Sequence, residues 1–203
     1  MAGPTRYQRV TTASDYDTAG FPHYLLFDGM DDSLQSAAVD LTGTDKISLF
    51  NAIKNAQDTS FTVVMCNGNS NITAGSFQFS APVDGDDVWV CMNGSQLSAR
   101  RFSSLSILST AVYSSALDLR GTGWPATLRK NGVAQVQVGS ENGSADAGTG
   151  NYGNLPLRVG MRSDGAAPYN GRIYQVVLLG RTATADEITA TEAYIASKSG
   201  VVL

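Results

Sequence analysis

The carboxylates are the side chains with which this chain could carry out acid–base chemistry. Hydrolysis of a glycosidic bond needs two carboxylates about 5–9 Å apart, one acting as acid and the other as base or nucleophile. The three glutamates are Glu141, Glu187 and Glu192. The first falls in a predicted loop and the other two in a predicted helix, so no strand presents glutamates at alternate positions. The sequence therefore predicts no catalytic residue and no enzyme.

The remaining acidic pairs and the sole histidine show no catalytic pattern either. Asp31–Asp32 and Asp86–Asp87 are adjacent pairs, which point to opposite sides of a strand or bond backbone amides in a turn. His23 has no partner that a motif identifies, and neither a nucleophile elbow nor a zinc motif occurs. A glycoside hydrolase or lyase is therefore the weakest functional hypothesis.

Three aspartates crowd one predicted turn, in the sequence Phe-Asp-Gly-Met-Asp-Asp. These are Asp28, Asp31 and Asp32. Carboxylate and loop carbonyl oxygens suit calcium, so a calcium site is one hypothesis for this turn. The simpler interpretation is that the carboxylates bond backbone amides two residues on, as tight turns require. No other cofactor is predicted.

Glycan binding would need aromatic side chains that stack on sugar faces and planar polar groups that bond hydroxyls. The candidate ligand-binding residues are Trp124, Tyr152, Arg162, Asp164 and Tyr169. Trp124 lies in Gly-Thr-Gly-Trp-Pro, a predicted loop, where ligand binding, an oligomer interface and simple rim packing are equally good interpretations. Tyr152 lies in a predicted Gly-rich loop, residues 140–153, and the other three belong to the predicted loop MRSDGAAPYNG, where we expect them to lie outside the core.

The two cysteines, Cys66 and Cys91, are too few for a disulfide scaffold or a structural zinc site. Each falls in a predicted strand, and a third strand, residues 76–81, lies between them. In a simple meander they would be two strand spacings apart, roughly 9–10 Å, which is too far for a bridge. We therefore expect two free, buried thiols.

Composition limits the classes of partner. The 203 residues carry a formal net charge of −4, and only 16% of them are charged, so no basic field is available for nucleic acid or an anionic membrane. The apolar runs are far shorter than the ~20 residues of a membrane span, and the N-terminus lacks the apolar region of a secretory signal. We expect neither nucleic-acid binding nor membrane insertion.

The elements that must position these residues are short strands. Residues 155–161 alternate apolar and polar, residues 173–179 are apolar on both parities, and Asn131-Gly132 is a strong hairpin signal. Thr184 and Glu187 fit a capping box that begins a helix ending at Gly200. Ten to twelve strands and one terminal helix predict an all-β, two-sheet antiparallel β-sandwich or jelly roll. We expect an N-terminal arm or edge segment over residues 1–20 and one domain over residues 21–203.

Three segments resemble a known family. YLLFDGMDDSLQS (residues 24–36), LRKNGV (residues 128–133) and the C-terminal stretch from LRVGMRSDG to the end of the helix are similar to concanavalin A-like, laminin-G-like jelly-roll domains of phage and prophage structural proteins. Tyr169 stands where Phe is expected, and residues 182–184 replace a more usual Leu-Ser pair. The resemblance implies two antiparallel sheets whose rim loops bind glycans or proteins, in some relatives with calcium.

The resemblance implies a phage virion protein that is not an enzyme. Such a protein, in a tail, fibre or capsid decoration, would bind other virion proteins, form a homo-oligomer, and contact a host-surface glycan. It would be exposed on a virion assembled in the bacterial cytoplasm. The alternative is a carbohydrate-binding module for bacterial surface polysaccharide, and the sequence leaves open both the glycan and the position on the particle.

Overall fold

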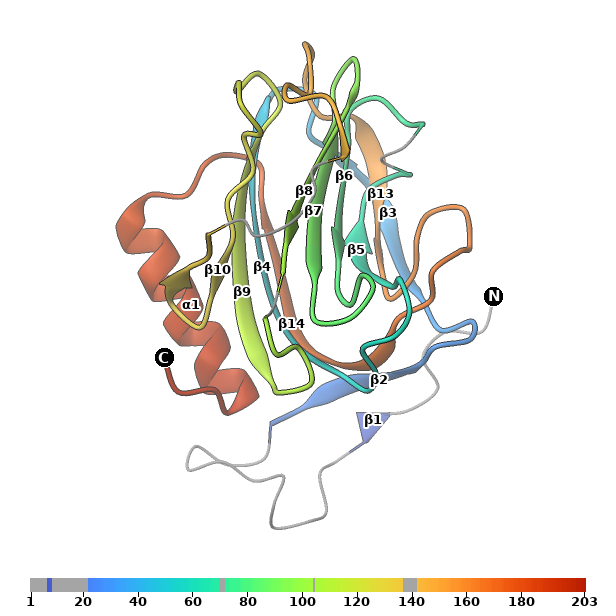
Figure 1. Ribbon diagram of the computed structural model, residues 1–203, viewed down its shortest axis with the longest axis vertical. Helices are drawn as coiled ribbons and strands as arrows, with labels where there is room; N and C mark the ends of the chain where they lie inside the picture. The colour runs from blue at the N-terminus through green and yellow to red at the C-terminus, as the bar shows by residue number, and fades with distance from the viewer. Residues whose placement is uncertain (1–6, 9–21, 70–71, 104, 137–141) are drawn as a thin grey trace.

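Two antiparallel sheets form a β-sandwich, as the strand pattern predicts (Figure 1). The computed structural model describes residues 7–8, 22–69, 72–103, 105–136 and 142–203. The first sheet has the order β1 (Tyr7–Gln8), β2 (Tyr24–Asp28), β14 (Asn170–Leu179), β4 (Lys46–Asn55), β9 (Ala111–Asp118), β10 (Arg129–Lys130) and β11 (Val133–Ala134). The second has the order β12 (Asn142–Gly143), β8 (Leu97–Phe102), β7 (Val88–Asn93), β6 (Ser76–Ser80), β5 (Val63–Cys66), β13 (Asn154–Val159) and β3 (Leu34–Asp40).

The main core lies between the two sheets. Its largest fully buried side chains include Phe27, Phe77, Phe79, Phe102 and Tyr113. Phe50 is also fully buried but belongs to a second cluster on the other face of the first sheet. Alternate residues of β4 show why: Ile47, Leu49 and Ile53 pack between the sheets, whereas Phe50 and Ala52 face the helix. This is the period-2 geometry of a strand that is covered on both faces.

The helix α1 (Ala185–Ser199) covers the outer face of the first sheet (Figure 1). Its capping box is present as predicted, because the Glu187 amide donates to Thr184 Oγ1 at 3.3 Å and the Thr184 amide donates to Glu187 Oε2 at 2.9 Å. Gly200 ends the helix with φ 74°. Ile195 is fully buried against Phe50 and Val112. β14 is thus packed on both faces, as the apolar residues on both parities of residues 173–179 predict.

Several local predictions are confirmed and others are corrected. Cys66 and Cys91 are free and buried, and Asn131-Gly132 forms the predicted turn, with φ values of 48° and 77°. The hairpin around it is much shorter than expected, because β10 and β11 each hold two residues. Of the expected N-terminal arm only β1 lies within the described residues, and it pairs with β2.

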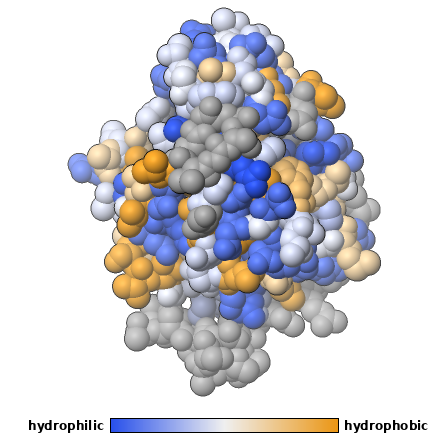
Figure 2. Space-filling model, viewed as in Figure 1, coloured by the Kyte–Doolittle hydropathy of each residue, from blue (hydrophilic) through white to orange (hydrophobic). Residues whose placement is uncertain are grey.

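The outer surface is mainly hydrophilic in the view of Figure 2, with apolar side chains gathered toward the helix side and the C-terminus. Exposed apolar residues include Val133, Tyr194, Val202 and Leu203. Among the described residues, no helix has both the length and the apolarity needed to cross a membrane.

Candidate binding site

Trp124 lies in the loop between β9 and β10, at one end of the sandwich, with a left-handed backbone. Its φ is 63°, a conformation that L residues other than Asn and Asp seldom adopt. Two hydrogen bonds to its backbone hold it there: the Trp124 amide donates to Ala145 O at 2.6 Å, and Arg100 Nη1 donates to Trp124 O at 3.2 Å. The side chain is half-buried. A large aromatic residue is therefore held in a strained conformation at the rim.

A second loop, residues 144–153, lies beside the Trp124 loop at this end (Figure 1). Asp146 Oδ1 accepts a hydrogen bond from the Gly123 amide at 3.0 Å, directly before Trp124. Ala147 is fully buried, and its carbonyl accepts bonds from the amides of Gly94 and Gln96. The loop that supports Trp124 is thus itself fastened to the β7–β8 turn.

Arg120 adds a guanidinium group to the same rim. It donates to Asn151 Oδ1 at 3.0 Å and to Gly150 O at 3.3 Å, and it lies 3.5 Å from Asp45 Oδ2. Asn151 in turn donates to Thr42 O at 2.6 Å. We call Arg120, Trp124, Asp146 and Asn151 the Trp124 rim. It combines one indole with a guanidinium, a carboxylate and an amide, which are groups that stack on and hydrogen-bond to sugars.

Tyr152 is next to this rim in the sequence but does not belong to it. Its side chain is only 1% exposed and meets Phe77 edge-to-face, with ring centroids 6.1 Å apart. Burial raises the pKa of its hydroxyl well above the usual range. The expectation that Tyr152 contacts a ligand is wrong for this conformation, because the ring anchors the Gly-rich loop to the core instead.

Arg162 and Asp164 neutralise each other in the loop between β13 and β14. Arg162 donates through Nε and Nη2 to the two Asp164 oxygens, both at 2.9 Å, and Asn69 Nδ2 donates to Asp164 Oδ2 at 3.0 Å. The Arg162 guanidinium is the main cause that lowers the pKa of Asp164. No contact within the described residues joins this loop to the Trp124 rim, so the predicted ligand-binding residues do not form one site.

Tyr169 lies at the base of the same loop but not on the surface. It is fully buried and packs edge-to-face on Phe27, with ring centroids 6.0 Å apart. Burial raises the pKa of its hydroxyl well above the usual range. The expectation that Tyr169 lies outside the core is therefore wrong, since it closes the sandwich below the β2–β3 turn.

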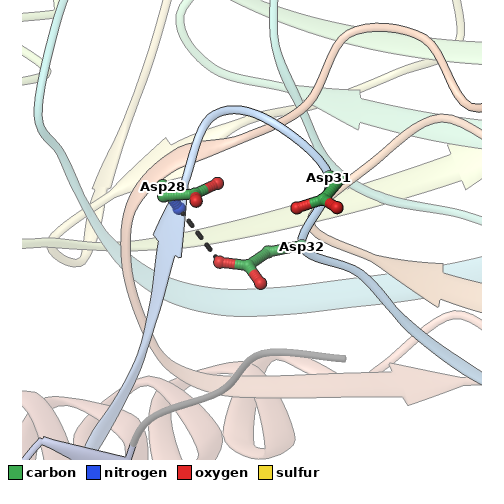
Figure 3. A group of neighbouring side chains, drawn as sticks. All are labelled: Asp28, Asp31 and Asp32. Atoms are coloured by element: carbon green, nitrogen blue, oxygen red, sulfur yellow. Dashed lines mark hydrogen bonds between the residues drawn. The ribbon is translucent and has the colours of Figure 1, made fainter. Parts of the chain in front are cut away.

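The three predicted calcium ligands do lie together at that turn. Single carboxylate oxygens of Asp28, Asp31 and Asp32 lie within 4.8 Å of one another (Figure 3). The Asp28 amide donates to Asp32 Oδ2 at 3.2 Å, and the Met30 amide donates to Asp28 Oδ1 at 2.8 Å. Turn bonding therefore uses one oxygen of Asp28 and one of Asp32. Oxygen donors of this kind fit calcium, but the turn bonds already account for Asp28 and Asp32, and calcium stays a prediction.

The glutamates within the described residues have structural partners. Glu192 is 2% exposed and accepts from Ser114 Oγ at 2.5 Å and from Arg129 Nε at 2.8 Å. Glu187 caps α1 and pairs with Arg181 at 2.6 Å. Neither is available as a free acid or base.

The sequence did not reveal the polar members of the rim. Asn151 adjoins the predicted Tyr152 in the Gly-rich loop, which is the one local signal for it. Arg100 and Asp146 reach the Trp124 loop through tertiary contacts that no local pattern encodes. Arg120 lies in that loop, and its bond to Gly150 O is likewise a tertiary contact.

Comparison with known proteins shows the fold. No protein-family profile and no curated protein sequence matches this chain. Among solved structures, domains LG4-5 of the mouse laminin alpha1 chain align with a TM-score of 0.53 and 11% identity over 80% of this chain and 44% of that one. The botulinum neurotoxin serotype G binding domain aligns with a TM-score of 0.62 and 9% identity over 95% and 46%.

A third structure is domain 4 of a GH43 extracellular arabinanase from Geobacillus stearothermophilus, solved in complex with arabinotriose. It aligns with a TM-score of 0.50 and 15% identity over 85% of this chain and 72% of that one. The chain spans less than half the length of the laminin and neurotoxin chains. These similarities confirm the laminin-G-like sandwich that the sequence resembles, while the phage connection stays a prediction.

Proposed function

We propose that this protein is a non-catalytic binding domain that recognises a carbohydrate at the Trp124 rim. The observation that carries the proposal is the positive φ of Trp124, 63°, fixed by hydrogen bonds to Ala145 and from Arg100. A left-handed conformation costs an L residue roughly 1–2 kcal/mol. Strain of this kind concentrates at binding and catalytic sites, where it positions a side chain for a ligand.

The neighbouring groups have the chemistry that a sugar needs. The half-buried indole can stack on the apolar face of a pyranose or furanose ring, while Arg120, Asp146 and Asn151 offer donors and acceptors to hydroxyl groups. Because backbone and side-chain bonds fasten both loops before a ligand arrives, little ordering remains to oppose binding. The arabinanase domain shows that a similar fold was solved with an oligosaccharide, which supports the class of ligand and says nothing of its position here.

A glycan array with the full chain tests the proposal. We expect binding to at least one class of oligosaccharide, and we expect Trp124→Ala to abolish it. The matched control is Tyr194→Ala, which removes an aromatic side chain that is 51% exposed on α1 and should leave binding unchanged. Equal binding by wild type and Trp124→Ala would exclude this rim as the site.

A second candidate function is a structural protein of a phage virion, in a tail, fibre or capsid decoration. Its support is the resemblance of residues 24–36 and of the C-terminal unit, together with a chain in which only 16% of residues are charged. In that role the domain would bind other virion proteins, with or without glycan binding. Cosedimentation with purified virions and light scattering of the isolated chain distinguish the two: a monomer that ignores virions but binds a glycan supports the first function alone.

A further inference from the structure

The first sheet has an edge that no described strand completes. β14 pairs with β4 from Gly171 to Leu179, but on its other side β2 pairs only with residues 170–173. Tyr24 of β2 still packs on Tyr174, with ring centroids 5.6 Å apart, but no further strand of the described chain continues the sheet beside residues 174–179. Alternate backbone N–H and C=O groups along these six residues therefore lack sheet partners.

The open edge lacks the side chains that usually protect an edge strand against pairing. Residues 174–179 read Tyr-Gln-Val-Val-Leu-Leu, with no charge and no proline, and all six are half-buried. Edge strands normally carry lysine, proline or inward-pointing charges that prevent another strand from adding. The bulge between Ile173 and Gln175 belongs to the pairing of β14 with β4 and lies where β2 stops pairing with β14. It bends β14 at the point where the open edge begins.

The sandwich is also least closed at this edge. Six apolar residues pack against the main core but stay partly exposed: Leu25, Val39, Leu157, Val159, Val176 and Leu178. All of them belong to β2, β3, β13 and β14, which are the strands at this side of the two sheets. The apolar layer therefore opens to the surface along one seam.

A cavity of about 350 Å³ opens within that seam, directly beside the free edge. It is lined by His23, Tyr24, Leu25, Leu34, Val159, Ile173, Tyr174, Gln175 and Val176. The lining contains no aspartate, glutamate, lysine or arginine, so a charged group entering the cavity would lose its hydration without gaining a partner. The cavity therefore favours an uncharged occupant.

We propose that the free edge of β14 and its cavity accept an added β-strand from a partner protein. The strand is an extended, uncharged segment with apolar side chains at alternate positions. Six edge residues span about 20 Å, enough for a strand of about six residues, whose backbone bonds residues 174–179 while one apolar side chain enters the cavity. The inference is independent of the glycan site, because the Trp124 rim is built from other strands and loops.

Hydrogen–deuterium exchange of the full chain, resolved by residue, tests the proposal. In the free protein we expect period-2 protection over residues 174–179, because only alternate amides bond β4. The probe is a peptide of seven alternating threonine and valine residues, with one lysine added at each end for solubility and with both termini capped. It should raise the protection of the fast-exchanging amides at least tenfold, whereas a peptide with a central proline should not.

Leu34→Asp places a charge on the cavity wall at a residue that is already 40% exposed, and we expect it to weaken peptide binding at least tenfold. The control is Leu108→Asp, at a residue 46% exposed between β8 and β9, which should bind like wild type. Protection of residues 174–179 that rises with protein concentration would identify a second copy as the occupant and overturn the proposal. Full protection in the dilute free chain would overturn it too, since the chain would then cover its own edge.

Discussion

Replacing Trp124 by glycine and by alanine separates backbone strain from binding. Both variants remove the indole and its packing. The bonds that hold the loop use the Trp124 backbone amide and carbonyl, so the positive φ of 63° should persist in both. Alanine then keeps a conformational cost of roughly 1–2 kcal/mol, whereas glycine avoids it but loses roughly 0.5–1 kcal/mol more backbone entropy on folding. We expect the glycine variant to be more stable than the alanine variant by about 0.5–1 kcal/mol.

Urea denaturation and thermal melting of the two variants measure that difference. For a chain of this size it corresponds to roughly 1–4 °C in Tm. The same samples, applied to a glycan array, should both lose binding, because both lack the indole. An alanine variant as stable as the glycine variant would show that residue 124 carries no strain, and the main support for the binding site would be lost.

Three further predictions concern groups outside the rim. In urea denaturation, Arg129→Ala should lower the free energy of unfolding by about 3 kcal/mol and Glu192→Ala by about 2 kcal/mol, because the loss of Arg129 leaves the Glu192 carboxylate, 2% exposed, without its cation. Equal losses in the two variants would contradict this order. The Arg181 guanidinium, with the Thr184 amide, lowers the pKa of Glu187 to about 2. The ionised Glu187 therefore stabilises the fold fully above pH 4.5, and this stabilisation is lost as the pH falls toward 2. Glu187→Gln should make the free energy of unfolding depend less on pH between these two values. Burial raises the pKa of the Cys66 thiol to about 11, so thiol reagents at pH 8 should modify it only after unfolding, and rapid labelling of the native chain would refute the burial.

Local sequence patterns predicted the elements whose cause is local. The capping box of α1, the left-handed Gly200 and the Asn131-Gly132 turn depend on residues within a few positions of one another. The Asp28–Asp32 turn is of the same kind. Strand β3 was not predicted, because its sequence Leu-Gln-Ser-Ala-Ala-Val-Asp is almost wholly exposed and shows no apolar alternation.

The candidate site was less predictable, because burial is a tertiary property. Tyr152 and Tyr169 follow or occupy loops rich in glycine and alanine, which suggested exposure, yet both rings pack on phenylalanines of the core. Trp124 lies in a loop, as its Gly-Thr-Gly-Trp-Pro context predicts, while its role as a ligand-binding residue stays a prediction. That Arg100 fastens its carbonyl depends on β8 lying beside the loop, which no local pattern indicates.

The pairing of β4 with β14 has a consequence for synthesis of the chain. β4 ends at Asn55, and its partner begins at Asn170. At about 5–20 residues per second, a ribosome needs on the order of 10 s to make the intervening residues. During that interval Phe50 and Ala52 lack the helix that covers them in the finished protein. The nascent chain must therefore keep an apolar strand soluble until β14 and α1, residues 170–199, emerge, and fragments that stop before β14 should aggregate or be held by chaperones.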